Sequence, residues 1–434
     1  MLRELLKKIP YSAILVNKAR QNFSYFQNIA NFFKMKIIQK RYTKVLTSKK
    51  RKVLEGKRLK VAFFVTQKQL WAAQSLHDEF IKNEYFEPII VVFPNIEDKV
   101  NTKAYTFDEN YQFFKKQGMK VIRGYDPNVN VYTSSKNICA DIVFYDQPSP
   151  QIHKSLLWNK ISKESLICYI PYGYKIGAFA QAHFNMHLQN SCWKVFAESE
   201  WHKLQFIKYG ALNGRNVVVS GYPKLDEYNI TLTSQKRNFK KIIWAPHWSI
   251  GELSIGFSTF ETNYKFFLQY AIDNPNIHWV FKPHQRLKNY IVESSFLTQE
   301  EVDDYFKQWE KLPNAIFYND SNYFDIFKDS DALITDCGSF LAEYLPTKKP
   351  ILHLFSSNNS GYNEIGKKLI KSYYKSTDNK SIKKFINDVV VNENDSLRDE
   401  RLSCLPLVLQ NSEGAGKFIV NYIITELQKD HASA

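Results

Sequence analysis

Short apolar runs alternate with amphipathic stretches from Leu59 almost to the C-terminus, and this alternation constrains the fold more than any other feature. Strands that alternate with helices form a parallel sheet covered by helices on both faces. The alternation breaks at Gly221-Tyr222-Pro223 and at the polar stretch 231–240, and then restarts. The sequence therefore predicts two doubly wound α/β domains, with the ligand in a cleft between them, outside the carboxyl ends of the strands.

The predicted domains are 59–228 and 229–434, preceded by an extension, 1–58. The predicted strands of the first domain are 61–65, 88–93, 120–122, 141–145, 166–170, 194–197 and 216–219. Those of the second domain are 241–245, 278–282, 315–318, 331–335 and 351–354. The predicted helices include 69–82, 107–117, 264–273 and 414–429.

The N-terminal extension carries almost all of the net charge of +16. Residues 1–60 contain 17 Lys and Arg but only two acids, whereas the rest of the chain is close to neutral. Ten aromatic, Leu and Ile residues from Ile14 to Ile38 are interleaved with these bases. We expect a basic amphipathic helix or helix pair that lies on an anionic membrane surface. The alternatives are a helix packed on the core and a nucleic-acid-binding arm, of which the second is the weakest because no basic stripe follows.

Composition excludes several classes of protein. With 44% hydrophobic and 15% aromatic residues the chain is not disordered, and no apolar run approaches the ~20 residues of a membrane span. The five cysteines are widely spaced and form no C-x-x-C pair, which argues for a reducing compartment and against a zinc site. We expect a cytoplasmic protein. The run 49–52, Lys-Lys-Arg-Lys, is expected to be a solvated linker ahead of the first strand.

The segment 330–354 carries the most functional information. An apolar run ends in Thr335 and Asp336, a turn containing Gly338 and Ser339 follows, and then come a helical pattern and a second apolar run. A strand, a tight turn and a helix N-terminus form the unit that binds anions and nucleotides in α/β sheets. Because the same residue types cap helices, a purely structural unit is the alternative.

Polar residues follow two other predicted strands of the second domain as well. Because polar residues recur at the ends of successive strands, we expect one polyvalent anionic ligand, although each residue alone fits a structural role. For a nucleotide diphosphate, Lys282, His284 and Ser339 would contact phosphate, and Glu343, one helical turn beyond Ser339, would contact the ribose. The strand-end residues concerned are Pro246, His247, Lys282, His284, Thr335, Asp336, Gly338, Ser339 and Glu343.

These motifs carry a resemblance to a known family. In order along the chain they are V-F-A-E-S-E-W-H, S-G-Y-P-K-L-D, W-A-P-H-W, F-K-P-H and D-A-L-I-T-D-C-G-S-F-L-A-E-Y followed by K-P-I-L. This series, over about residues 165–355, resembles the CDP-glycerol glycerophosphotransferase family, which builds teichoic acids and related capsule polymers.

The resemblance implies a GT-B fold, no metal, no cofactor beyond the CDP-linked donor, and peripheral attachment to the inner face of the cell membrane. It also implies that an acceptor hydroxyl attacks the β-phosphate of a CDP-alditol and that CMP leaves. By position, His284 would be the phosphate-contacting histidine, Ser339 and Thr335 would hold pyrophosphate oxygens, and Glu343 would stand near the nucleotide.

The sequence departs from the family pattern on the acceptor side. Where the family has H-G-T-P-L-K, this chain has Y-G-Y-K-I, with Tyr172 in place of a catalytic histidine and with Gly173 and Lys175 beside it. Because an unperturbed phenol has a pKa of ~10, Tyr172 is a poor base near neutral pH. The candidates for another base are Asp146, His183, His187 and His247. His247 also replaces a Thr of the family, and D-C-G-S replaces D-Y-S-S.

Three functions fit these observations. The first is a transferase that moves an alditol phosphate, such as glycerol phosphate, from a CDP-linked donor to a membrane-linked or capsular glycan acceptor. The second is a GT-B glycosyltransferase that uses a nucleotide sugar. The third is a non-catalytic scaffold that binds a nucleotide or glycan, which the loss of the usual base supports.

Overall fold

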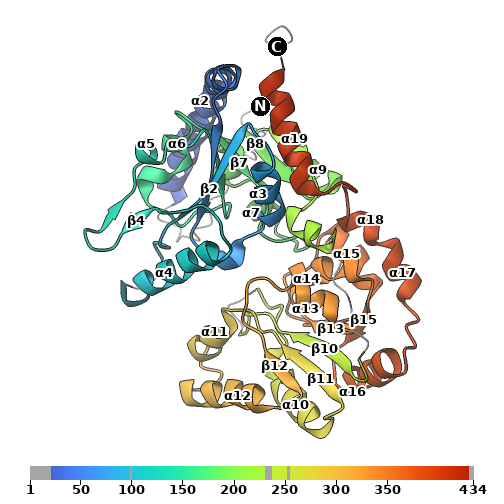
Figure 1. Cartoon of the computed structure of the whole chain (residues 1–434). Coiled ribbons are helices and arrows are strands. Elements are labelled where there is room, and N and C mark those ends of the chain that lie inside the picture. The colour runs from blue at the N-terminus through green and yellow to red at the C-terminus, as the bar shows by residue number, and fades with distance from the viewer. Residues whose placement is uncertain (1–20, 98–99, 230–236, 252–254, 430–434) are drawn as a thin grey trace. The chain divides into compact units, whose positions relative to one another are not determined.

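The computed structural model describes residues 21–97, 100–229, 237–251 and 255–429, and the chain divides into two compact units (Figure 1). Unit 1 comprises 1–173, 179–226 and 410–434, and unit 2 comprises 174–178 and 227–409. Each unit is built around one parallel sheet with helices on both faces. The predicted α/β fold class, with two doubly wound parallel sheets, is confirmed.

Unit 1 contains a seven-stranded parallel sheet in the order β3-β2-β1-β6-β7-β8-β9. The strand order reverses between β1 and β6, which is the switch point at which doubly wound sheets bind ligands. The strands are β1 (Leu59–Val65), β2 (Phe86–Val92), β3 (Val121–Arg123), β6 (Ile142–Tyr145), β7 (Leu166–Tyr169), β8 (Lys194–Ala197) and β9 (Val217–Val219), and a separate hairpin pairs β4 (Tyr125–Asp126) with β5 (Val131–Tyr132).

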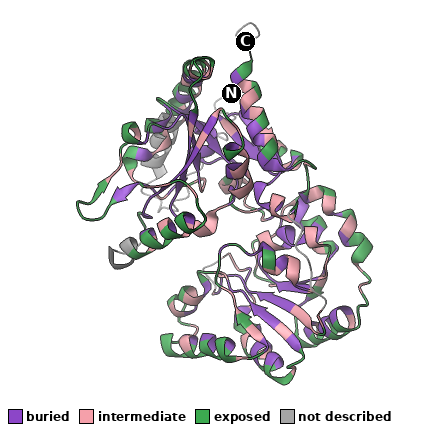
Figure 2. Ribbon diagram, in the orientation of Figure 1, coloured by how far each residue is buried: buried purple, intermediate pink, exposed green. Residues whose placement is uncertain are grey.

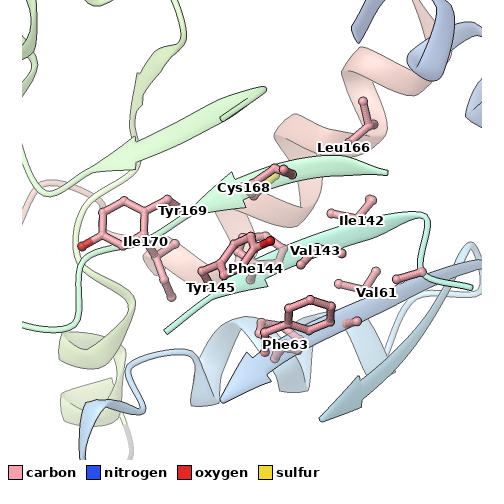
Figure 3. Packing of buried hydrophobic residues seen from close by; sticks show 14 of the residues in the cluster. Val61, Phe63, Ile142, Val143, Phe144, Tyr145, Leu166, Cys168, Tyr169 and Ile170 are labelled. Carbon is pink, nitrogen blue, oxygen red and sulfur yellow. The ribbon is translucent and has the colours of Figure 1, made fainter. Parts of the chain in front are cut away.

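Apolar side chains fill the sheet of unit 1 because both of its faces are covered. Val61 pairs with Ile142 and Phe63 with Phe144, and the two phenyl rings stack with centroids 5.1 Å apart (Figure 3). Strands buried on both faces read as continuous apolar runs, which is why their positions were predictable from the sequence. The central strands of both sheets are buried, whereas the edge strands β3 and β12, the β4–β5 hairpin and the outer faces of the helices are partly exposed (Figure 2).

Unit 2 contains a six-stranded parallel sheet in the order β12-β11-β10-β13-β14-β15. Its switch point lies between β10 and β13, which pair from Ile242↔Ala332 to Ala245↔Thr335. The edge strand β15 was not predicted, because its Tyr-Lys-Ser sequence carries no apolar run. The strands are β10 (Lys240–Ala245), β11 (Ile277–Phe281), β12 (Ala315–Phe317), β13 (Ala332–Thr335), β14 (Ile351–Leu354) and β15 (Tyr374–Ser376).

The helices of unit 1 are α2 (Gln21–Leu54), η2 (Lys68–Leu70), α3 (Gln74–Ile81), α4 (Val100–Lys116), α5 (Ser135–Ile138), η3 (Lys154–Leu156), α6 (Trp158–Ile161), α7 (Ala180–Phe184), α8 (His187–Ser191), α9 (Glu200–Tyr209) and α19 (Ala415–Gln428), with η4 (Pro223–Asn229) at its boundary. Those of unit 2 are α10 (Phe260–Asp273), α11 (Leu287–Glu293), α12 (Gln299–Lys311), α13 (Phe324–Asp329), α14 (Gly338–Glu343), η5 (Leu345–Thr347), α15 (Glu364–Lys371), α16 (Asn379–Lys384), η6 (Phe385–Val391), α17 (Arg398–Ser403) and α18 (Leu405–Val408).

The long helix α2 packs on unit 1 through one apolar stripe. Met35, Ile38, Tyr42 and Val45 recur at helical spacing and are all buried. For these residues the alternative of a helix packed on the core is therefore confirmed. The remaining extension, 1–20, lies outside the described residues. None of the helices in the described parts of the chain is both long and apolar enough to cross a membrane.

The basic run 49–52 is not a solvated linker, because it forms the last turns of α2. The Lys49 ammonium is buried and lies 2.8 Å from the Asp141 carboxylate, which also binds the Lys52 ammonium at 2.8 Å. The amide of Lys60 donates to the same carboxylate. Two of the four charges therefore pair with one acid at the start of β6, a partner that no local sequence pattern indicates.

The C-terminal helix α19 packs on unit 1, although the sequence assigned residues 229–434 to the second domain. The carboxylate of Asp226 accepts hydrogen bonds from the amides of Ala415 and Gly416 and from the hydroxyl of Ser75, each at 2.8 Å. Gly416 has no room for a side chain, since a Cβ there would lie 2.8 Å from the amide of Leu76. These contacts hold the start of α19 against α3.

Candidate functional site

At the switch point of unit 2, a buried carboxylate holds two loops together. Asp336 directly follows β13 and is fully buried. Its carboxylate accepts hydrogen bonds from the amide of His247, which follows β10, at 2.5 Å, and from the amide and hydroxyl of Thr259, at 2.6 and 2.8 Å. Burial raises the pKa of Asp336 to about 6, although these hydrogen bonds act in the opposite direction. Asp336 therefore fixes the position of His247.

Two histidines from neighbouring strand ends lie together at this point. The rings of His247, after β10, and His284, after β11, have centroids 5.5 Å apart. The amide of His284 donates to the carbonyl of Pro246 at 3.0 Å, which fastens the two strand ends to each other. The sequence predicted both histidines and Pro246 from their places after strands, and the structure brings the three residues together.

Both imidazoles are neutral near pH 7. Burial lowers the pKa of His247 to about 3. Burial, followed by electrostatic interaction with neighbouring His247 and with the positive charges of Arg286 and Lys282, holds the pKa of His284 well below its ordinary value. The Nδ1 atoms accept the amide hydrogens of Ser249 and Arg286, at 3.2 Å each, so each ring carries its proton on Nε2. The pair can therefore donate hydrogen bonds to an anion without carrying charge beforehand.

Two of the predicted phosphate ligands already have structural partners. Lys282 is 6% exposed, and its ammonium donates to the carbonyl of Asp320 at 2.9 Å and lies 5.2 Å from the ring centroids of Tyr318 and Tyr323. Thr335 is fully buried and its hydroxyl donates to the carbonyl of Ala245 at 2.6 Å, across the β10–β13 pair. This geometry favours structural roles for Lys282 and Thr335 over the predicted contacts with phosphate.

The turn that opens α14 keeps its polar groups closer to the surface. Gly338 and Ser339 are half-buried, and the Ser339 hydroxyl lies 3.7 Å from the Cys337 thiol. A Cβ on Gly338 would contact Ile176 at 3.6 Å, so this residue approaches the 174–178 segment closely. The structure thus leaves the predicted phosphate contact of Ser339 sterically open.

Glu343 lies deeper than a ribose contact requires. It is 1% exposed, and its carboxylate accepts hydrogen bonds from the hydroxyl of Tyr323 and from the amide of Tyr174. The hydroxyl of Tyr228 donates to the Glu343 carbonyl at 2.6 Å. Glu343 therefore anchors residues 174–178 in unit 2, and its contact with ribose stays a prediction.

The switch point of unit 1 contains the same device as that of unit 2. Asp146 directly follows β6, and Thr66 directly follows β1. The amide and the hydroxyl of Thr66 both donate to Oδ2 of Asp146, at 2.7 Å. Burial raises the pKa of Asp146 to about 6, and these hydrogen bonds lower it. In both units, then, an Asp that follows a strand at the switch point (β6 in unit 1, β13 in unit 2) accepts hydrogen bonds from the amide and the hydroxyl of one Thr.

Asp146 lines a small pocket at this switch point. The pocket has a volume of about 20 Å³, enough for one water molecule, and Trp71, Pro171 and Tyr172 are among its other walls. Asp146 is half-buried, and Tyr172 is 43% exposed. Asp146 and Tyr172 therefore line the same pocket.

The other predicted acceptor-side residues are not among those that line this pocket. Gly173 is the last residue of its segment of unit 1, whereas Lys175 belongs to unit 2, where its carbonyl accepts the side-chain amide of Asn363 at 2.9 Å. His183 packs between Phe179 and Phe184, with ring centroids 5.4 and 5.9 Å away. The ring contacts favour a structural role for His183, whereas the acceptor-side role of the Lys175 side chain stays a prediction.

Sequence reasoning missed the two threonines and Ser249. Thr66 directly follows an apolar run, so the strand-end criterion could have found it, but Thr259 and Ser249 lie in a loop without any local signal. Ser249 contacts Nδ1 of His247 at 2.7 Å. No group of side chains suited to hold a metal ion occurs within the described residues.

No protein-family profile matches the chain, and no curated protein matches it in sequence. Solved structures do match it, at low identity. One is the wall teichoic acid polymerase TagF, an H-to-N variant soaked with CDPG, at a TM-score of 0.56 and 13% identity over 92% of this chain and 98% of that one.

Two further solved structures match the chain at similar TM-scores. The Staphylococcus aureus protein MnaA with UDP has a TM-score of 0.52 and 14% identity over 85% of this chain and 96% of that one. A UDP-N-acetylglucosamine 2-epimerase from Listeria monocytogenes has a TM-score of 0.53 and 10% identity over 86% and 98%. At this identity the matches show the GT-B-like fold and nothing finer.

Proposed function

We propose that the chain is a transferase that moves an alditol phosphate from a CDP-linked donor to a cell-surface glycan acceptor. The observation that carries the proposal is the convergence of three separate motifs at one switch point: W-A-P-H-W supplies His247, F-K-P-H supplies His284, and D-C-G-S supplies Asp336. The likeness of the fold to TagF supports it. In a sheet of this type, ligands bind where these residues lie.

On the donor side, His284 contacts the diphosphate. Its Nε2–H donates a hydrogen bond to a phosphate oxygen, and the negative charge of the donor raises the pKa of the imidazole when it binds. Asp336 contributes indirectly, by holding His247 beside His284. Ser339, at the start of α14, is the second phosphate ligand of the proposal. Fixed dipoles of this kind stabilise the charge that develops on the transferred group.

On the acceptor side, Asp146 is the general base. Its carboxyl group has a pKa of about 6, which leaves it ionised at neutral pH and basic enough to accept a proton. The acceptor hydroxyl oxygen forms a bond to the β-phosphorus, the bond from that phosphorus to the CMP oxygen breaks, and the hydroxyl proton passes to Asp146. CMP leaves with the bonding electron pair, so no oxidant or further reactant is needed.

The membrane partner is proposed from the outward face of α2. Phe33 and Ile37 are 60% and 53% exposed, and Lys40, Lys44 and Arg51 continue the same face towards the C-terminus at helical spacing. Helix α2 contains no acidic residue. An apolar patch followed by a row of bases suits an anionic bilayer surface, such as the inner face of the cell membrane. The apolar face of α2 is already used in packing, so it does not contribute.

A nucleotide-sugar glycosyltransferase is the second candidate. The observation that favours it is the likeness of the fold to MnaA and the Listeria 2-epimerase, at TM-scores close to that of TagF. Donor groups and bases are where these reactions differ, and this chain lacks the histidine that the glycerophosphotransferase pattern has at Tyr172.

Release of nucleotide from a panel of CDP- and UDP-linked donors, with bacterial wall and capsule glycans as acceptors, tests the proposal. We expect CMP from CDP-glycerol or CDP-ribitol. Loss of turnover in His284→Ala and in Asp146→Asn, with unchanged thermal unfolding, is expected as well. UDP or CMP from sugar nucleotides alone would establish the second candidate. Release from none of the donors would refute both and leave the non-catalytic scaffold.

A further inference from the structure

Unit 1 contains a second, larger pocket, away from Asp146. It has a volume of about 170 Å³ and lies between α2, α6 and α8, as far as the described residues show. A cavity of ~150 Å³ is large enough for a six-membered ring such as benzene. The pocket could therefore accept one ring of a small molecule, which the 20 Å³ pocket at Asp146 could not.

Tertiary hydrogen bonds fix the wall that α2 contributes. The side-chain amide of Gln39 donates to the carbonyls of Cys192 and Asn190, at 2.9 and 3.2 Å, and the hydroxyl of Tyr42 donates to the carbonyl of Ser191 at 2.6 Å. Ile38 is 2% exposed. Because these contacts lie within two turns of the pocket, its shape does not depend on loose apolar packing alone.

The lining combines an aromatic surface with neutral polar groups. The rings of Trp158 and His187 lie almost parallel, 13° apart, with centroids 6.5 Å from each other. Burial lowers the pKa of His187, so near neutral pH its imidazole offers one hydrogen-bond donor and one acceptor. Asn159 and Ser191 also offer both kinds of group, and Lys34 adds one positive charge.

This chemistry suits a sugar. Sugar hydroxyl groups donate and accept hydrogen bonds, as the amide, hydroxyl and neutral imidazole of the lining do, and the apolar face of a sugar ring packs against an indole. A phosphate would require several basic side chains, and Lys34 is the one Lys or Arg among the lining residues. We infer that this pocket binds a monosaccharide ring of the glycan acceptor, an inference that rests on the proposed function.

The pocket adjoins the outward face of α2, which we propose as the membrane partner. Lys34, on the pocket wall, directly follows Phe33, which we propose to face the bilayer. A sugar carried by a membrane lipid is therefore a suitable occupant.

Saturation-transfer NMR on the full chain tests the inference without any donor. The probes are glucose, N-acetylglucosamine, methyl glucoside and octyl glucoside, and inorganic phosphate is followed by its own resonance. We expect saturation of the sugar-ring protons. Tighter binding of octyl than of methyl glucoside would indicate a lipid-linked sugar, and equal binding a free one. Phosphate binding without sugar binding would overturn the inference.

Two variants place the binding in this pocket. Trp158→Ala removes the aromatic surface and should lower sugar affinity about tenfold. Asn159→Trp, at an exposed position, should fill the pocket without disturbing the core. Trp201→Ala, a half-buried tryptophan on α9, is the matched control and should bind as the wild type does. Equal binding in all three variants would contradict the assignment. Sugar binding without CMP release would refute only the proposed function. CMP release without sugar binding in this pocket would refute only this inference.

Discussion

The hydrogen bond from the Thr66 hydroxyl to Asp146 should set the pH at which the enzyme works. Thr66→Val keeps the shape of the side chain and the backbone amide, but it removes the hydroxyl that donates to Oδ2 at 2.7 Å. A hydrogen bond to a charged group contributes about 1.5–3 kcal/mol, and one pKa unit corresponds to about 1.4 kcal/mol. Because the bond stabilises the ionised carboxylate, its loss raises the pKa of Asp146, by about one unit if half of its energy is recovered elsewhere.

The expected result is a shift in the pH profile of kcat/KM, measured as CMP release. A base must be deprotonated to act, so activity falls below its pKa. The acid limb should move from about pH 6 in the wild type to about pH 7 in the variant, with rates about fivefold lower at pH 6 and unchanged at pH 9. Thr66→Ser, which retains the hydroxyl, should restore the wild-type profile.

Two results would refute this reasoning. An acid limb that stays in place in Thr66→Val would mean that Asp146 is not the titrating base. A loss of activity by the same factor at every pH would mean that Thr66 acts only on the structure. Direct titration of the Asp146 carboxyl carbon by NMR, with Asp146→Asn to assign the signal, separates a wrong pKa from a wrong function.

Three further outcomes are expected. Asp141→Asn leaves the buried charge of Lys49 without its partner and should lower the free energy of unfolding, measured in urea, by about 3–5 kcal/mol. The control Glu87→Gln, which breaks the exposed pair with Lys120, should lower it by less than ~1 kcal/mol. Equal losses in the two variants would contradict this prediction. Asp336→Asn turns one acceptor into a donor and should cost about 1–3 kcal/mol; unchanged stability would disprove its role. Phe33→Glu with Ile37→Glu should abolish binding to anionic vesicles, whereas Ile316→Glu should not; retained binding would refute the membrane face.

The sequence predicted the positions of strands well wherever a strand consists of a buried run of apolar residues. The central strands β1, β6, β10 and β13 are short apolar runs, and the structure has them within two residues of their predicted positions. The edge strand β15 was missed because its stability comes from pairing with β14 and not from its own residues. For helix α2 the sequence predicted the helix but not its partner, because an apolar stripe has the same sequence pattern whether it faces a bilayer or a protein core.

The candidate site was predictable as a place but not as a set of roles. Residues after parallel strands necessarily gather at one edge of the sheet, so His247, His284 and Asp336 could be expected together. The sequence could not predict which of the strand-end residues would remain available for a ligand. Lys282 has its partners at 318–323, and Glu343 has one partner 169 residues away, at Tyr174.

The sequence by itself determined the two doubly wound sheets and the strand ends at which chemistry is possible, because apolar periodicity and chain order are local properties. Only the tertiary structure decided how each polar group is used. It paired Lys49 with Asp141, joined α19 to the first unit through Asp226, and placed a Thr on each switch-point Asp. A buried polar group must find a partner, and that partner is chosen by proximity in space, which the order of residues does not contain.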